Sequence, residues 1–468
     1  MTKVVASLRE AIERAGLKDG MTVSFHHHLR NGDYVLNMVM QEIAGMGIGD
    51  LTMNASSLFD VHLPLLDHVQ NGVVSTILTD YMAAGLGRAI SHGAMENPVQ
   101  FRTHGGRPSD MARGVTPVDV AFIAAPACDP MGNCSGKYGP SACGSLGYAM
   151  ADARYAKHVV VVTDNLVPYP LQDWSIPETE VDSVVCVGSI GDPKGIVSGT
   201  TKITRDPVGL VMAAYAAKVI ENSGLLKDGF SFQTGAGGAS LAAASFLKDI
   251  MLRDKIRGSF GLGGITGYMV DMLRAGCFEK LMDVQCFDLQ AVESLREDPR
   301  HLEISAMHYA SPSAKSAVVN SLDVVILGAT EVDTDFNVNV HTDSNGLIMG
   351  GSGGHSDTAA GSKLAMIIAP LQRARLPIVT DRVHCISTPG KDIDVLVTQA
   401  GIAVNPRNGE LADRLKAAGL PITDIRQLKE KAERLTGVPN HLRRGERVVA
   451  NVISRDGELL DQIWSCAE

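Results

Sequence analysis

The 468-residue sequence lacks the features that mark several common classes of protein. Its eight cysteines form no CxxC pair, which argues against a zinc ribbon or a thioredoxin-type site. It has no long basic run and a net charge of −10, so nucleic acid and membrane are not expected partners. Its most apolar helical stretch, 208–220, is too short to span a bilayer, and 1–16 predicts an amphipathic helix rather than a signal peptide. We therefore expect a cytoplasmic protein with reduced thiols.

Aromatic residues and the common nucleotide-binding motifs are also scarce. Aromatics make up 5% of the chain, whereas glycine occurs 48 times, which favours closely packed helices and many tight turns. There is no P-loop and no GxGxxG followed by an acidic residue, so a nucleotide hydrolase or a dehydrogenase is disfavoured. No convincing Cys–His pair points to a thiol hydrolase.

Two internal matches indicate a tandem duplication. The tetrad LKDG begins at 17 and again at 226, an offset of 209 residues. The segment 117–133 matches 321–337 at an offset of 204, and the order of the matches is the same in both halves. The second match pairs Asp119, Asp129 and Asn133 with Asp323, Asp333 and Asn337. Two ordered matches predict that the chain consists of two copies of one fold.

Short apolar runs alternate with helical patterns in both halves. They occur at 119–125, 158–163, 183–188, 323–329 and 364–370. Strands that are apolar on both faces and alternate with helices predict an α/β fold with open, mostly parallel sheets. We place the division at Asp206-Pro207, a helix-start signal, giving domains 1–205 and 206–468. The segment 447–464 predicts two strands joined at Asp456-Gly457.

Glycine-rich turns are the first candidates for a binding site. Gly235, Gly237 and Gly238 lie between a predicted strand and a predicted helix, where backbone N–H groups can bind an anion or an oxyanion. The alternative is a plain tight turn. The segments 261–267 and 350–357 repeat the pattern, and three such turns suggest a long ligand lying against backbone.

The segment 25–33, FHHHLRNGD, could be interpreted as a metal site, but adjacent side chains on an extended segment alternate in direction and cannot converge on one ion. We predict no metal. His26, His27 and Arg30 suit a polycarboxylate instead, because arginine forks onto carboxylates. Gly105, Gly106 and Arg107 form a similar turn. The alternative is a surface loop.

Glu331 follows an apolar run and aligns with Ala127 of the first half, so only one copy carries a carboxylate here. Nearby glycines could supply oxyanion donors; they are Gly350, Gly351, Gly353 and Gly354. A carboxylate in such a site could add to a thioester carbonyl and form an anhydride. A covalent nucleophile, a general acid or base, and a solvated charge all remain open for Glu331.

Taken together, these segments resemble the alpha chains of citrate lyase in the CoA-transferase superfamily. The resemblance rests on 19–33, 103–107, 119–133, 141–153, 230–242, 262–271, 281–288, 331–340, 350–359 and 397–406. It implies two tandem CoA-transferase-type domains with the active site between them. It implies the reaction of an acetyl-S-carrier with citrate to give a citryl-S-carrier and acetate. It also implies an oligomer with beta and gamma subunits, in which gamma bears a phosphoribosyl-dephospho-CoA arm.

The resemblance also implies roles for the candidate residues. Glu331 matches the nucleophile of related CoA-transferases, whereas in citrate lyase alpha chains the citrate carboxylate is thought to attack directly. The implied catalytic residues are Glu331, Gly353 and Gly354. The implied contacts to CoA or the carrier arm are Gly235, Gly237, Gly238, Gly263, Gly264, Gly350 and Gly351. The implied citrate contacts are His26, His27, Arg30, Gly105, Gly106 and Arg107. The alternatives are a thioester hydrolase, another carboxylate CoA-transferase and a structural subunit.

Overall fold

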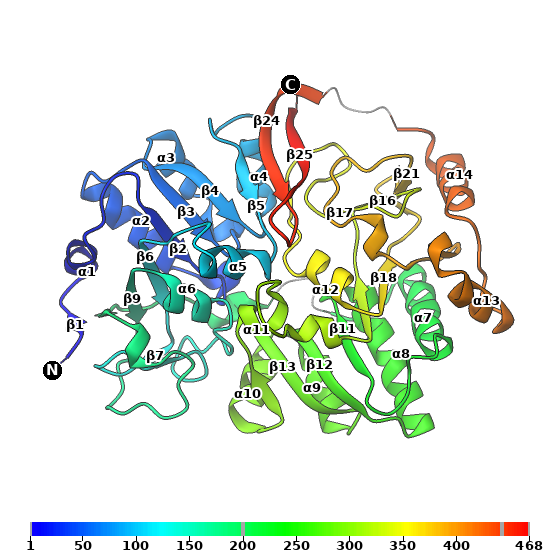
Figure 1. Ribbon diagram of the computed structural model, residues 1–468, viewed down its shortest axis with the longest axis horizontal. Helices are drawn as coiled ribbons and strands as arrows, with labels where there is room; N and C mark the ends of the chain where they lie inside the picture. The colour runs from blue at the N-terminus through cyan, green and yellow to red at the C-terminus, as the bar shows by residue number, and fades with distance from the viewer. Residues whose placement is uncertain (1, 198–201, 440–443, 467–468) are drawn as a thin grey trace.

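The computed structural model describes residues 2–197, 202–439 and 444–466. Two large sheets lie side by side, one formed by strands within 4–186 together with the C-terminal hairpin and one formed by strands within 231–404 (Figure 1). The C-terminal hairpin runs between the two halves in the same view. The sequence prediction of an α/β fold with mostly parallel sheets is confirmed.

The first sheet has ten strands in the order β1-β10-β9-β6-β2-β3-β4-β5-β24-β25. Every pairing is parallel except that of β24 with β25. Its strands are β1 (Val4–Val5), β2 (Thr22–Phe25), β3 (Leu51–Ala55), β4 (Val74–Thr79), β5 (Val99–Phe101), β6 (Val120–Ala124), β9 (His158–Thr163), β10 (Ser183–Cys186), β24 (Arg444–Ile453) and β25 (Leu459–Cys466).

The second sheet has eight strands in the order β14-β13-β12-β11-β15-β18-β22-β23. Only the pairing of β22 with β23 is antiparallel. Its strands are β11 (Ser231–Thr234), β12 (Gly258–Ile265), β13 (Phe278–Cys286), β14 (His301–Glu303), β15 (Val324–Leu327), β18 (Leu364–Ile368), β22 (Val395–Thr398) and β23 (Gly401–Val404).

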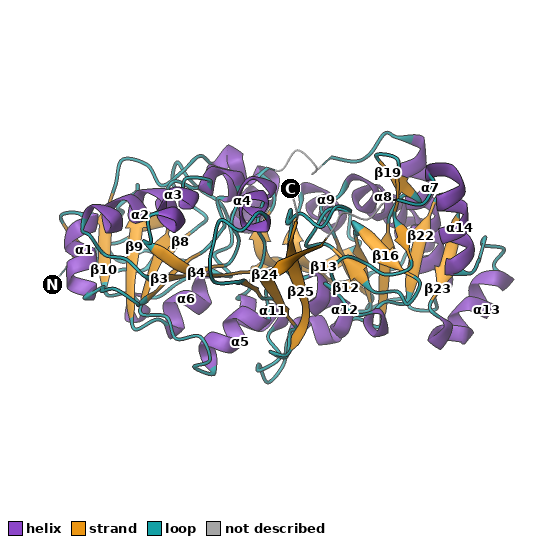
Figure 2. Ribbon diagram, turned by 90° about the horizontal axis from the view of Figure 1, so that it is seen from above, coloured by secondary structure: helices purple, strands orange, loops and turns teal. Residues whose placement is uncertain are grey.

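Helices lie on both sides of the sheets (Figure 2). This layering explains the apolar runs, because a strand covered on both faces has no solvent-facing side. In β9, Val159 to Val162 are all at most 1% exposed. The helices are α1 (Leu8–Ala15), α2 (Val35–Gly45), α3 (Leu65–Gln70), α4 (Ala84–Ser91), α5 (Gly106–Ala112), α6 (Ala149–Tyr155), α7 (Pro207–Asn222), α8 (Gly238–Asp254), α9 (Gly267–Arg274), α10 (Leu289–Glu297), α11 (Ala306–Ala310), α12 (His355–Gly361), α13 (Gly409–Ala417) and α14 (Ile425–Thr436).

The predicted duplication is visible in strand register. The hairpin of β7 (Ala127–Cys128) and β8 (Cys134–Ser135) pairs Ala127 with Ser135. The hairpin of β16 (Glu331–Asp333) and β17 (Val338–Asn339) pairs Glu331 with Asn339, again 204 residues later. Within each hairpin an aspartate accepts from the side chain of an asparagine four residues on, at 2.9 Å in the first copy and 3.1 Å in the second.

The C-terminal strands differ from the predicted division. Residues 444–466 were assigned to the second half, but β24 pairs with β5, so the hairpin extends the first sheet. The hairpin itself was predicted, and Gly457 supplies the left-handed turn with φ 95°. The predicted helix start at Asp206 is confirmed, because its side chain accepts from Gly209 N at 3.1 Å. The division into domains 1–205 and 206–468 stays a prediction.

The N-terminal segment also differs in detail. A helix was predicted over 1–16, but residues Val4–Val5 form β1, which pairs with β10, and the helix begins at Leu8. Ser7 caps it by accepting from Glu10 N at 3.2 Å. Over the described ranges of the chain, no helix is long and apolar enough to cross a bilayer.

Candidate functional site

Loops that follow the carboxyl ends of strands in both sheets meet between the two halves. In open parallel sheets this edge is the usual place for a ligand. The loop after β2 contacts the second half through Gln285, at the end of β13, whose amide donates to His27 O at 3.0 Å. The loop after β5 pairs with the glycine-rich turn through a bridge between Thr103 and Gly353. The candidate site is therefore built from both halves.

The three consecutive histidines are buried, so they are not a surface loop. His26 uses both ring nitrogens, one with His28 and one to accept from Ala124 N at 2.8 Å. His27 uses Nδ1 with Ser56 Oγ at 2.7 Å, and no described residue bonds to its Nε2. Burial lowers the pKa of His26 to about 4 and holds the pKa of His27 and His28 well below its usual value. Of the three, His27 is the one that can offer a ring nitrogen to a ligand.

Arg30 is a cation held between two aromatic rings. Its guanidinium carbon lies 5.2 Å from the ring centre of Phe59 and 4.9 Å from that of Phe287. The guanidinium makes one described hydrogen bond, to Ile196 O at 3.4 Å, and no carboxylate of the described chain pairs with it. Its φ of 52° is left-handed, a conformation that costs a non-glycine residue energy and that clusters at functional sites. Arg30 is thus placed to bind an anion from outside the chain.

His104 joins this group of side chains, although it was not among the predicted site residues. Its Nδ1 bonds to Asp80 Oδ2 at 2.9 Å. Its ring centre lies 5.5 Å from that of His27 and 4.5 Å from that of Tyr148. We call His27, Arg30, His104 and Tyr148 the imidazole–arginine cluster. The Phe59 ring packs against this cluster and contacts both His27 and Arg30.

Arg107 is buried, and other residues of the chain occupy its guanidinium. It is 3% exposed, and its guanidinium forms a bidentate pair with Asp152 (2.6 and 3.3 Å) and two hydrogen bonds to Asn54. Its charge is therefore already balanced. Gly105 N donates to Asp357 at 2.8 Å and Gly106 N donates to Thr103 Oγ1 at 2.8 Å. Of these three predicted citrate contacts, Gly105 therefore holds the loop to the second half, whereas Gly106 and Arg107 bond within the first half.

The turn 350–354 packs against the first half. A Cβ on Gly351 would collide with the Asp80 carbonyl oxygen, and one on Gly353 would lie 3.1 Å from His104 Nε2. Gly353 N donates to Asp80 O at 3.1 Å, whereas no acceptor among the described residues contacts Gly354 N. Of the other predicted oxyanion donors, Gly350 N donates to His341 O at 3.2 Å, whereas Gly351 N, like Gly354 N, contacts no described acceptor. Gly350 and Gly354 also contact Val340 and Tyr309 closely.

The same turn has the spacing GxSxG, centred on Ser352, which can mark a hydrolase nucleophile. Here Ser352 Oγ bonds to Ser356 Oγ at 2.6 Å. The histidine that contacts Ser352 does so through Nε2 and the Ser352 backbone N, at 3.3 Å. No described histidine contacts the hydroxyl, so the turn lacks the base that a serine nucleophile requires.

The turn between β11 and α8 leaves open space. A Cβ on Gly235 would meet nothing closer than 3.6 Å, and one on Gly237 nothing closer than 4.0 Å. Neither residue has a positive φ. Neither internal packing nor backbone conformation thus explains these two glycines, and this favours an external ligand. A Cβ on Gly238, by contrast, would lie 2.8 Å from Lys202 O. A Cβ on Gly263 or Gly264 would collide with the side chain of Gln233 or Phe287, respectively.

Glu331 lies in β16, is 3% exposed, and makes hydrogen bonds through one carboxylate oxygen. Its Oε2 accepts from Asn339 Nδ2 at 3.0 Å and from His384 N at 3.1 Å. Asn339 Oδ1 in turn accepts from His341 N at 3.1 Å, and the His341 ring contacts the Ser352 backbone. Glu331 is thereby linked to the glycine-rich turn, but no described contact joins it to the imidazole–arginine cluster.

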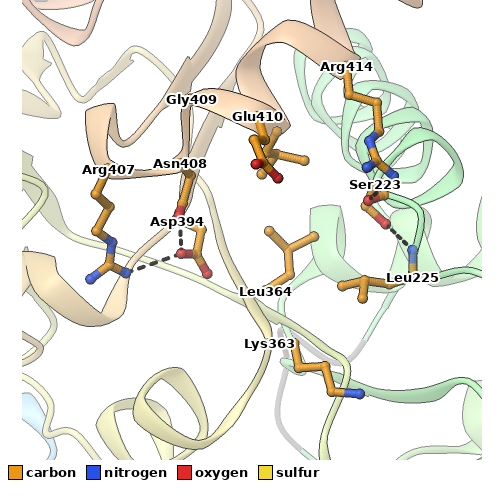
Figure 3. A pocket seen from close by; sticks show the side chains of 11 residues that line it. Ser223, Leu225, Lys363, Leu364, Asp394, Arg407, Asn408, Gly409, Glu410 and Arg414 are labelled. Atoms are coloured by element: carbon orange, nitrogen blue, oxygen red, sulfur yellow. Dashed lines mark hydrogen bonds and ion pairs between the residues drawn. The ribbon is translucent and has the colours of Figure 1, made fainter.

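Away from this site, a pocket of about 400 Å³ lies at the other edge of the second sheet, near the amino ends of β18 and β22 (Figure 3). Its basic residues already have partners. Arg407 pairs with Asp394 at 3.1 Å, Lys363 pairs with Asp323 at 2.7 Å, and Arg414 donates to Ser223 O at 3.1 Å. Because these charges are satisfied, we assign it no role in binding.

The residues that the structure describes contain no group of three or more His, Cys, Asp and Glu side chains that could hold a metal ion. The described site offers imidazole, guanidinium, phenol and backbone N–H groups instead. It therefore suits an anionic, carboxylate-bearing ligand rather than a cation.

The comparisons with known proteins agree with this chemistry. The family model of the citrate lyase alpha subunit matches residues 1–466. The citrate lyase alpha chain of Klebsiella pneumoniae is 51% identical over 461 residues, which are 98% of this chain and 91% of that one. A crystal structure described as the alpha subunit of citrate lyase from Streptococcus mutans in complex with citrate is 50% identical. It superposes with a TM-score of 0.98, covering 100% of this chain and 92% of that one.

A more distant structure shares the fold alone. It belongs to a Pseudomonas malonate decarboxylase hetero-tetramer, is 17% identical and has a TM-score of 0.70, covering 94% of this chain and 88% of that one. The full-length family match and the 51% identity carry the assignment. The chain belongs to the citrate lyase alpha subunit family.

Proposed function

We propose that the chain exchanges acetate for citrate on a thioester, so that an acetyl thioester and citrate give a citryl thioester and acetate. The observation that carries the proposal is Arg30, a cation without a described carboxylate partner, stacked between Phe59 and Phe287 beside His27. Family membership supports the same reaction, and a relative solved in complex with citrate supports the acceptor.

In this proposal citrate binds to Arg30 and His27 of the imidazole–arginine cluster. A guanidinium fork binds a carboxylate through two hydrogen bonds, and only one of the Arg30 donors is used within the described chain. His27 Nε2 adds a further hydrogen-bonding position at the same place. Arg107 then acts as a positioning residue, since Asp152 and Asn54 occupy its guanidinium.

The acyl group is carried by CoA or by the phosphoribosyl-dephospho-CoA arm of a carrier subunit. We place this arm over Gly235 and Gly237, where a Cβ would meet no close neighbour. The thioester carbonyl is placed at the turn 353–354, where Gly354 N is available as a donor.

We propose direct attack by a citrate carboxylate rather than an acyl–enzyme on Glu331. The carboxylate oxygen adds to the acetyl carbonyl, the C–S bond breaks, and a citric–acetic anhydride forms; the sulfur then attacks the citryl carbonyl and acetate departs. Glu331 holds the hairpin through Asn339 and has no described contact with the cluster. In this reading it supports the site and is not acylated.

Beta and gamma subunits of a citrate lyase complex are the proposed partners, with the beta subunit cleaving the citryl thioester. The chain is proposed to act as an oligomer in the cytoplasm, in keeping with eight cysteines that are all unpaired. In this proposal the glycine-rich turns bind the reactants, so the chain is an enzyme and not only a structural subunit of the complex.

The test is citrate-dependent chemistry with acetyl-CoA as substrate. Purified chain, acetyl-CoA and citrate are mixed, and citryl-CoA and acetate are quantified by mass spectrometry. The proposal expects both products in equal amounts and none without citrate. Acetate release that is independent of citrate would instead establish the hydrolase, and absence of both products with the beta and gamma subunits present would leave only the structural role.

A further inference from the structure

His104 and Asp80 form a fixed pair beside the glycine-rich turn. The two residues follow neighbouring strands, β4 and β5, so the sheet itself brings them together. Asp80 is fully buried, and its Oδ2 bonds to His104 Nδ1 at 2.9 Å. Its Oδ1 is buried without a hydrogen-bond partner in the described structure. The Asp80 carboxylate therefore makes a single side-chain contact, which is to His104.

The backbone fixes the same pair from the other side. His104 N donates to Gly353 O at 2.9 Å, and Gly353 N donates to Asp80 O at 3.1 Å. The imidazole is thus held by its own main chain, by a carboxylate and by the turn it faces. A ring held in this way has one orientation and one preferred tautomer, with the proton on Nδ1 when neutral.

The other ring nitrogen of His104, Nε2, is available to contact a reactant. No described residue bonds to His104 Nε2, and a Cβ at Gly353 would sit 3.1 Å from it. The nitrogen therefore lies against the turn where the thioester carbonyl is placed. Among the groups packed on the ring, Asp80 is the one that forms a hydrogen bond with it, whereas His27 and Tyr148 contact it through their rings.

We infer that His104, oriented by Asp80, donates a proton to the thioester sulfur as it leaves and takes the same proton back in the second step. The inference rests on the proposed transfer. As the citrate oxygen bonds to the acetyl carbon, the C–S electron pair moves to sulfur and sulfur receives the Nε2 proton. When sulfur attacks the citryl carbonyl, the proton returns to Nε2, and the anhydride C–O bond breaks to release acetate.

This cycle needs no other reactant, because no proton is gained or lost over the exchange of one carboxylate for another. It also explains why this imidazole alone in the cluster is paired with a carboxylate. Positioned proton transfer contributes about 100- to 10,000-fold to a rate. His104 would then be a catalytic residue, and Asp80 a positioning residue that acts through it.

The test is chemical rescue of His104→Gly with imidazole, using acetyl-CoA and citrate and measuring citryl-CoA. We expect the rate to fall about 100-fold or more, with the citrate KM within threefold of wild type. Added imidazole should restore the rate in a saturable way, and a series of substituted imidazoles should restore it in order of their basicity. His104→Gln, which keeps a donor toward Asp80 but cannot shuttle a proton, should be as slow and should not be rescued by imidazole.

His301 provides the matched control. It is a fully buried histidine whose Nε2 bonds to Asp283 at 3.1 Å, but its Nδ1 is used by Ser294. His301→Gly should gain nothing from imidazole. The inference is overturned if His104→Gln, or a folded His104→Gly, keeps more than a third of the wild-type rate, or if imidazole fails to raise the rate of folded His104→Gly. Wild-type protein measured alongside separates the two claims, since an inactive wild type refutes the proposed function and not the role of His104.

Discussion

Replacing Arg30 by glutamine removes the one cation that the described site offers to citrate. Charge-assisted hydrogen bonds contribute about 1.5 to 3 kcal/mol, and each ~1.4 kcal/mol corresponds to a tenfold change in affinity. Arg30 is partly buried and lies between Phe59 and Phe287, which reduces its screening by solvent. We expect Arg30→Gln to raise the citrate KM about 10- to 150-fold. The KM for acetyl-CoA should stay within about threefold.

The assay is the initial rate of citryl-CoA formation over a range of citrate concentrations. Arg30→Lys keeps the charge but loses the planar fork, so its citrate KM should fall between wild type and Arg30→Gln. Arg300→Gln is the control, because Arg300 pairs with Asp298 on the surface at 2.7 Å and should leave both KM values unchanged.

Stability can be separated from binding at the same position. Arg30 has a φ of 52°, a conformation that costs a non-glycine residue about 1 to 2 kcal/mol, while its ring contacts return about 0.5 to 2 kcal/mol. The free energy of unfolding of Arg30→Gly should therefore lie within about 1 kcal/mol of the wild-type value, since the two effects offset each other. A citrate KM that stays within threefold of wild type in folded Arg30→Gln or Arg30→Gly would refute the assignment.

Four further substitutions test other parts of the site. The Cβ of Gly237→Ala meets no atom closer than 4.0 Å, so this variant should keep the melting temperature but raise the acetyl-CoA KM about tenfold. Gly351→Ala should instead lower the melting temperature, because its Cβ collides with Asp80 O. Equal acetyl-CoA KM values for Gly237→Ala and wild type would show that the carrier arm does not bind at this turn. Glu331→Gln should stay unlabelled and remain within about tenfold of the wild-type rate, and intact-mass detection of a hydroxylamine-sensitive adduct on Glu331 in wild type would contradict direct attack. Burial raises the pKa of Asp357 to about 6, so the folded state holds this proton more tightly than the unfolded state; that stability is present below about pH 4 and is lost as the pH rises through 6. The unfolding free energy of Asp357→Asn relative to wild type should thus rise by about 3 kcal/mol between pH 4 and 7, and a flat difference would refute the assigned shift.

The sequence predicted the fold well because the relevant signals are local or periodic. The run 158–163 is β9 residue for residue, since a strand buried on both faces shows as unbroken apolar residues. The repeat offsets predicted paired hairpins that share register, as Ala127 and Glu331 demonstrate. The pairing of the C-terminal hairpin with β5 was not predicted, because strand partners far apart in sequence leave no local signal.

The site was predicted only in part for the same reason. Arg30 was chosen from its neighbours, and the structure leaves it without a described carboxylate partner. Arg107 looked equivalent, but Asp152, 45 residues later, occupies its guanidinium. His104 carried no signal because Asp80 lies 24 residues away on the neighbouring strand. Pairings of this kind depend on strand order, which a single sequence does not display.

The most direct test of the transfer is the origin of one oxygen atom in the acetate. Citrate labelled with ¹⁸O in its carboxylates is mixed with acetyl-CoA and excess protein, and the acetate from a single turnover is analysed by mass spectrometry. Direct attack predicts acetate that carries one ¹⁸O from citrate, because the bridging anhydride oxygen leaves with the acetyl group. Unlabelled acetate would contradict the account, since its oxygen would then come from water or from a carboxylate of the protein.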